Sequence, residues 1–175
     1  NFSSVVLSSV TATVISRHFL GNQPAFQIPP FDLYGISDFL YYLVFGIITA
    51  IIAWLFIKVL YKSEDLFNSI KIPEYLKPVG GGLIIGVIGL FFPQVFGVGY
   101  ETIEASIAGK LIPWVIVALV FLKILATAIT LGSGGSGGIF APSLFIGALL
   151  GEAFGLLAHK VIPGMAIPPG AFALV

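Results

Sequence analysis

Long apolar runs, separated by short polar, glycine-rich or proline-rich stretches, dominate the pattern along this chain. A run of about 20 apolar residues is the length that an α-helix needs to cross the hydrocarbon core of a bilayer. The pattern predicts helices at about 1–20, 38–66, 79–98, 100–110, 111–131 and 139–159, and the start of another at 170–175. We therefore expect an all-α chain in which most helices are long enough to span a membrane.

The predicted helices differ in length and regularity. The 38–66 segment is longer than a perpendicular span requires, so we expect it to be tilted. The 79–98 segment is rich in glycine, and its Gly82 and Gly86 form a small-xxx-small pair suited to close helix packing. The polar 100–110 segment is too short to span and should lie at the surface or re-enter the membrane. These features predict an all-α integral membrane fold, a multi-helix bundle with tilted, broken and re-entrant helices.

Composition supports a multi-pass membrane chain and narrows its chemistry. Of the 175 residues, 58% are apolar and 9% charged, and the mean hydropathy is +1.08; ordinary soluble domains are about 25% charged. The formal net charge is zero, so nothing suggests a nucleic acid partner. Cysteine is absent, which excludes disulfides, thiolate catalysis and cysteine-based metal sites. Because the chain lacks an initial Met and ends within an apolar run, we interpret it as part of a longer protein.

A glycine-rich turn at 132–142, with the sequence GSGGSGGIFAP, lies between two of the predicted spans. Glycine allows the chain to turn and a ligand to approach the backbone, and Pro142 suits the first turn of a helix. The amides of Ile139, Phe140 and Ala141 should then lie at a helix N-terminus, where unpaired N–H groups and the helix dipole attract an anion. Since no basic side chain lies within the turn, the anion would be held by dipoles and free to leave, which favours a conduction pathway.

The segment 123–144, which contains this turn, resembles the third signature region of the CLC family of chloride channels and proton-coupled chloride exchangers. The sequence Gly97-Val98-Gly99-Tyr100, followed by Ile103, resembles a second and weaker family feature. The order of the apolar segments also agrees with the second half of the CLC membrane domain. The resemblance implies half of an inverted-repeat CLC-type fold that transports chloride, with no enzymatic activity, no metal and no cofactor beyond the transported chloride and, in an exchanger, protons.

The resemblance also implies which residues meet the anion. Backbone amides of Ile139 and Phe140, with Ala141 nearby, would coordinate chloride, and the Phe140 side chain would line or narrow the path. The residues that shape the turn would be Gly137, Gly138 and Pro142. The serine- and threonine-rich segment 1–20 resembles in position the helix of the CLC dimer interface, which implies a homodimer in the bilayer.

Two other CLC signatures have no match in this chain. They are an earlier Gly-Ser-Gly-Ile-Pro turn and a Gly-Arg-or-Lys-Glu-Gly-Pro turn whose glutamate gates the path. The inner proton-transfer glutamate and the pore tyrosine of the family are also missing, so the sequence does not distinguish a channel from an exchanger. We expect the proton-transfer glutamate to lie before Asn1 and the pore tyrosine after Val175.

Lys123 and Glu152 lie in the interior of the predicted spans 111–131 and 139–159, where an ionic group is costly unless it faces protein, water or a partner. Lys123 has two interpretations: it raises the positive potential along an anion path, or it is a structural cation paired with a carboxylate or a helix C-terminus. Glu152 raises the same question with the opposite sign. The resemblance does not make Glu152 the gating carboxylate, and we interpret it as structural or interfacial.

Two rival interpretations come from other classes of protein. The segment 132–137 formally matches the G-x-G-x-x-G dinucleotide motif, and Glu152 lies at about the right distance for a ribose-binding acid. The preceding run is too long for a strand and no βαβ pattern follows, which argues against a dinucleotide enzyme. The other rival is an unrelated secondary transporter, or a subunit that only packs in a membrane complex and binds no anion.

Overall fold

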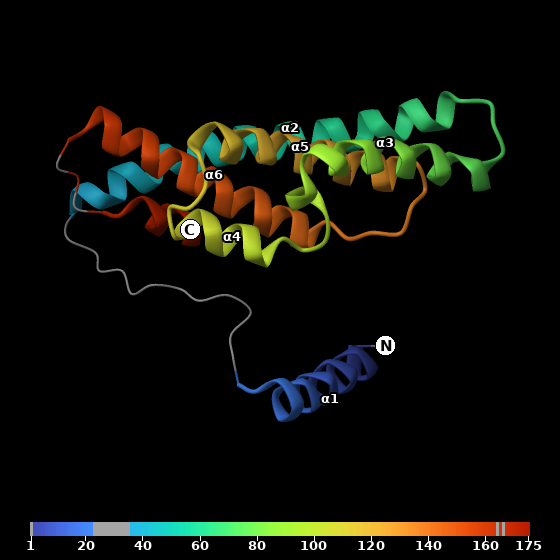
Figure 1. Cartoon of the computed structure of the whole chain (residues 1–175), viewed down its shortest axis with the longest axis horizontal. Helices are drawn as coiled ribbons and strands as arrows, with labels where there is room; N and C mark the ends of the chain where they lie inside the picture. Colours follow the sequence, from blue (N-terminus) through green and yellow to red (C-terminus); the bar gives the residue numbers. More distant parts are fainter. Residues whose placement is uncertain (1, 23–35, 164, 166) are drawn as a thin grey trace.

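The computed structural model describes residues 2–22, 36–163, 165 and 167–175, and the predicted loop at 21–37 lies mostly outside these ranges. Its helices are α1 (Phe2–Leu20), α2 (Ile36–Ser69), α3 (Lys77–Phe91), α4 (Tyr100–Ile107), α5 (Pro113–Gly132) and α6 (Phe140–Val161), with short 3-10 helices η1 (Glu74–Leu76), η2 (Pro93–Val95) and η3 (Pro169–Leu174). All regular elements in the described ranges are helical, which confirms the predicted fold class (Figure 1).

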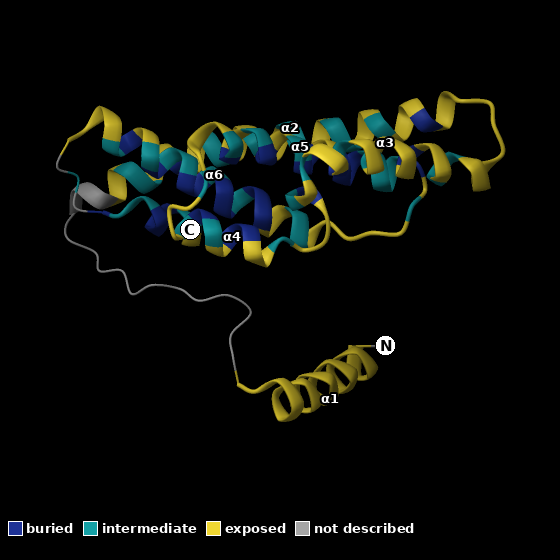
Figure 2. Ribbon diagram, viewed as in Figure 1, coloured by how far each residue is buried: buried dark blue, intermediate teal, exposed yellow. Residues whose placement is uncertain are grey.

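Helix α5 is the centre of the packed body. It contacts α2, α3, η2 and α6, and one of its faces is buried between them. The buried side chains of this face include Ile116, Leu119, Val120 and Ile124, which meet Phe145 and Leu149 of α6 in the main hydrophobic core. The spacing of the α5 residues by three and four positions keeps them on one face of the helix. The core therefore forms where α5 lies against its neighbours (Figure 2).

Helix α6 and η3 approach each other closely through glycine. A Cβ atom added to Gly151 would overlap the carbonyl of Phe172, and one added to Gly155 would overlap the backbone of Pro169. The predicted helix start at 170–175 is a 3-10 helix, Pro169–Leu174, in this structure. Phe172 is fully buried there and packs against Phe45 of α2.

Two helices end earlier than their patterns predicted. Helix α3 ends at Phe91, before position 98, because Pro93 has no N–H to donate and disfavours helical geometry at Phe92, whose φ is −132° and ψ 72°. Helix α4 ends at Ile107, before position 110. Gly109 adopts a positive φ of 66°, and its N–H and that of the next residue close the helix by bonding back to carbonyls of its last turn.

Much apolar surface faces outward, as a membrane chain requires. Among the described residues, four helical segments are long and apolar enough to cross a membrane by length and composition: Phe39–Ser69, Glu74–Phe91, Pro113–Gly132 and Phe140–Val161. Every described residue of α1 is exposed, and α1 lies apart from the packed body (Figures 1 and 2). The predicted role of α1 at a dimer interface stays a prediction.

Candidate functional site

The glycine-rich turn begins as the C-terminal cap of α5. Gly134 has φ +83°, and its N–H bonds to Leu131 O at 3.0 Å while the N–H of Gly135 bonds to Thr130 O at 2.8 Å. These two bonds form a Schellman motif, which pairs carbonyls that the end of a helix leaves free. The chain then folds back along α5, so that α6 begins beside the middle of α5 and not beyond its end (Figure 1).

Helix α6 begins with amides that have no acceptor within the helix. Ser143 N donates to Ile139 O at 3.0 Å, which makes it the donor of the first α-helical bond. The amides of Phe140 and Ala141 precede it, and Pro142 has no N–H. Ile139 is the N-cap residue and no side chain caps the helix. The Phe140 side chain is 82% exposed, so this end of α6 is open to an approaching ligand.

A chamber of about 310 Å³ lies behind the turn. We define the chamber by its lining residues, which come from α3, the 95–97 segment, α5, the glycine-rich turn and α6: Ile85, Val95, Phe96, Gly97, Lys123, Ala126, Thr127, Thr130, Leu131, Ser136, Gly137, Gly138 and Pro142. The structure thus brings three sequence features together, namely the lysine within α5, the turn-shaping residues, and the start of the Gly-Val-Gly-Tyr motif. The three predicted anion ligands, Ile139, Phe140 and Ala141, lie beside the chamber but do not line it.

Lys123 is buried and holds the segment before α4. Its side chain is 3% exposed, and Nζ donates to Val95 O at 2.8 Å and to Gly97 O at 2.7 Å. Nζ also lies 4.7 Å from the centroid of the Phe145 ring, a cation–π distance. Val95 is the last residue of η2, so the ammonium is paired with the C-terminus of a helix. A helix C-terminus is one of the two partners expected for Lys123 as a structural cation. Its electrostatic effect on an anion stays a prediction.

The second motif packs directly on α6. Gly99 is the N-cap residue of α4 with φ +85°, and a Cβ added there would overlap the ring of Phe145. A side chain at Gly99 would therefore require the Phe145 ring or one of the two helices to shift. Together with Lys123, this contact fixes the 95–99 segment against the end of α6 that carries the free amides.

Glu152 lies far from this site. It is 2% exposed on the α6 face that meets η3, and its Oε2 has no hydrogen-bond partner among the described residues. It follows Phe140 by 12 positions, or about 18 Å at 1.5 Å per residue. The structure therefore places it in the packing between α6 and η3.

The hydroxyl groups of the chamber were not among the residues predicted from the sequence. Thr127 and Thr130 follow Lys123 at four and seven positions, a spacing that places all three on one helix face. Thr130 Oγ1 donates to Ala126 O at 2.7 Å. This spacing was visible in the sequence and would have identified the face of α5 that lines the chamber.

Known proteins resemble the chain over its whole length. The family model for the voltage gated chloride channel matches residues 1–175. A putative chloride channel protein ClcB-like of Ralstonia nicotianae is 34% identical over 98% of this chain and 40% of its own length. Chloride channel protein CLC-f of Arabidopsis thaliana is 34% identical over 98% of this chain and 24% of its own length.

The H(+)/Cl(-) exchange transporter ClcA of Citrobacter koseri is 30% identical over 99% of this chain and 37% of its own length. The chain thus spans about a quarter to two fifths of the length of these three relatives. Because the family model covers every residue, the chain belongs to the voltage gated chloride channel family of integral membrane proteins.

Proposed function

We propose that the complete protein transports chloride across a membrane and that the start of α6 supplies part of the chloride site. The observation that carries this proposal is the open N-terminus of α6, where the amides of Phe140 and Ala141 have no acceptor within the helix. The amide of Ile139, at the N-cap, is the third donor of the proposed site. Family membership supports chloride as the anion.

The charges around the site favour an anion that is held loosely. Lys123 Nζ already donates to two carbonyls, so only one of its three N–H groups is left for an anion. Backbone dipoles and the positive end of α6 are weaker partners than an ammonium ion. Weak binding at such a site allows the anion to enter and also to leave, as conduction requires. We expect no cofactor beyond the transported ions.

The first experiment follows chloride and protons together in liposomes that contain the complete protein. Chloride efflux without proton movement identifies a channel, and proportionate proton counter-movement identifies an exchanger; the relatives include proteins with each kind of name. Absence of chloride flux from folded protein would refute the proposal. It would support the alternative of a packing subunit or an unrelated transporter.

Replacing Ile139 by proline tests the amide site directly. Proline removes one donor, and a hydrogen bond to a charged group contributes about 1.5–3 kcal/mol, so we expect chloride binding to weaken about 10- to 150-fold. Ile139→Val is the matched control because it changes the side chain but keeps the amide. If the proline variant bound chloride as tightly as the valine variant, the amide of Ile139 would not be a ligand.

The Phe140 side chain is the proposed lining of the path. Because it is 82% exposed, Phe140→Ala should leave folding unchanged and alter chloride permeation. Unchanged flux in this variant would remove Phe140 from the pathway.

We also propose that the complete protein is a homodimer that uses α1. Its side chains are exposed in this chain and include several serines and threonines, small residues that allow close packing of helices in a membrane. Cross-linking of a cysteine introduced at Ser8 should give a covalent dimer in the bilayer. A protein that stayed monomeric in lipid at all concentrations would contradict this assignment.

A further inference from the structure

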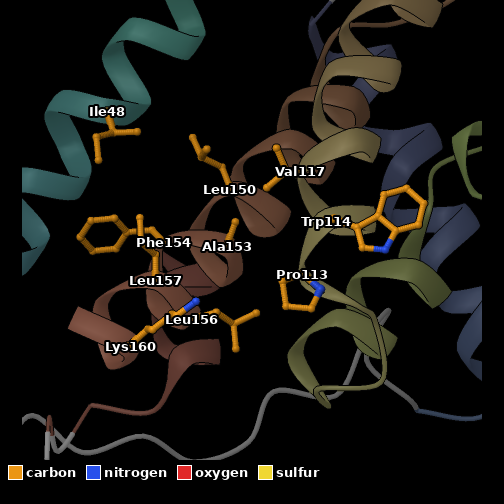
Figure 3. Close-up of a pocket in the computed structure, with 10 residues that line it drawn as sticks. All are labelled: Ile48, Pro113, Trp114, Val117, Leu150, Ala153, Phe154, Leu156, Leu157 and Lys160. Carbon is orange, nitrogen blue, oxygen red and sulfur yellow. The ribbon is translucent and has the colours of Figure 1, made fainter. Parts of the chain in front are cut away.

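An apolar groove of about 470 Å³ lies on the outer side of the packed body, away from the chamber. Its lining residues come from α2, α5 and α6: Ile48, Pro113, Trp114, Val117, Leu150, Ala153, Phe154, Leu156, Leu157 and Lys160. In Figure 3, side chains of α6 form the floor, with Ile48 of α2 on one side and Trp114 and Val117 of α5 on the other.

The floor of the groove is a continuous apolar stripe. Leu150, Ala153, Phe154 and Leu157 recur at the spacing of one face of a helix. Leu157 is 61% exposed and Val117 of the facing wall is 45% exposed, so the groove is open on its outer side. Both walls belong to helices that are long and apolar enough to cross a membrane, so the opening lies along membrane-spanning segments.

One end of the groove is chemically different from the rest. There α5 begins, with Trp114 in its first turn, and α6 ends, with Lys160 in its last turn. Trp114 and Lys160 are both exposed, and tryptophan and lysine are the residues that membrane helices place at the boundary between acyl chains and headgroups. Lys160 is the only charged residue among those that line the groove.

We propose that this groove binds an anionic phospholipid. One acyl chain lies along the stripe from Leu150 to Leu157, and the phosphate group pairs with the ammonium of Lys160. The apolar slot matches the acyl chain, and the cation at its interfacial end matches the negative headgroup. A segment of protein in the same place would have to supply its own partner for Lys160. The site is separate from the start of α6 and does not depend on chloride transport.

Photo-crosslinking in the complete protein tests the proposal. Phosphatidylglycerol and phosphatidylcholine that carry a diazirine on the acyl chain are incorporated into liposomes, and the labelled peptides are identified by mass spectrometry. We expect labels on 113–117 and 150–157. Lys160→Gln should reduce phosphatidylglycerol labelling roughly five-fold, the factor expected for one lysine near an anionic surface, and leave phosphatidylcholine labelling unchanged. Lys62→Gln, at an exposed lysine of α2 outside the groove, should change neither.

A second variant tests the apolar part of the site. Val117→Trp fills the groove from an exposed position and should reduce labelling by both lipids. Val87→Trp, on an exposed position of α3, is the matched control. Absence of label from both segments in folded protein, or unchanged headgroup preference in Lys160→Gln, would overturn the proposal.

Discussion

Replacement of Lys123 by methionine is the sharpest test of how the site is held together. Methionine is unbranched like lysine but carries no charge. The replacement therefore removes the ammonium that bonds to Val95 O and Gly97 O. The two carbonyls belong to the segment between α3 and α4, 28 and 26 positions earlier in the chain. The variant therefore releases this segment from α5.

The magnitude follows from the two contacts. Hydrogen bonds that involve a charged group contribute about 1.5–3 kcal/mol each. The variant also removes the cost of burying an ammonium ion, which offsets much of that loss. Val95 is buried, so its carbonyl loses its partner at a cost of about 1–3 kcal/mol, whereas Gly97 is exposed and water can replace the lysine there. We expect a net destabilisation of about 2 kcal/mol.

The assay is thermal unfolding of the complete protein in detergent. A loss of about 2 kcal/mol lowers the Tm by about 4–8 °C in a chain of 150–250 residues, and by less in a longer one. Lys123→Arg keeps the charge and the donors and should recover most of the Tm. Equal Tm values for wild type and Lys123→Met would refute the structural role. If Lys123→Met weakened chloride binding without lowering the Tm, Lys123 would act through its charge.

Glycine and acid variants give three further predictions. Gly99→Ala should lower the Tm more than Gly97→Ala, because both positions have positive φ but only Gly99 has a ring in the space of the new Cβ. Gly151→Ala should destabilise the protein, because the new Cβ would overlap the backbone of η3. Gly147 has open space at this position, so Gly147→Ala should be neutral or stabilising by up to about 1 kcal/mol in the same melting experiment. Glu152→Gln should leave the Tm equal or higher, since it replaces a buried carboxyl group whose Oε2 has no partner among the described residues; a clear loss of stability would indicate an important interaction of the carboxyl group.

The sequence by itself determined the helical elements and the start of α6. The long apolar runs predicted the helices of the body, because a membrane chain must satisfy its backbone groups within each segment. Pro142 and the preceding glycines predicted that α6 begins near position 140, which α6 does at Phe140. The end of α3 was predicted wrongly, although the sequence contains the signal for it. Pro93 forbids a continuous helix to position 98, but the residues after it are apolar and were included in the predicted span.

Only the tertiary structure decided which distant groups meet. Burial does not specify a partner, so the pattern around Lys123 left open whether a carboxylate, a helix end or an anion would face it, and the packing of η2 on α5 supplies two carbonyls. Packing also explains why position 99 requires glycine. The Phe145 ring, on another helix, occupies the space that a Cβ atom would need. The chamber and the apolar groove each need side chains from three or more segments. Hydropathy and turn chemistry act over a few neighbouring residues, whereas these sites depend on how whole helices pack.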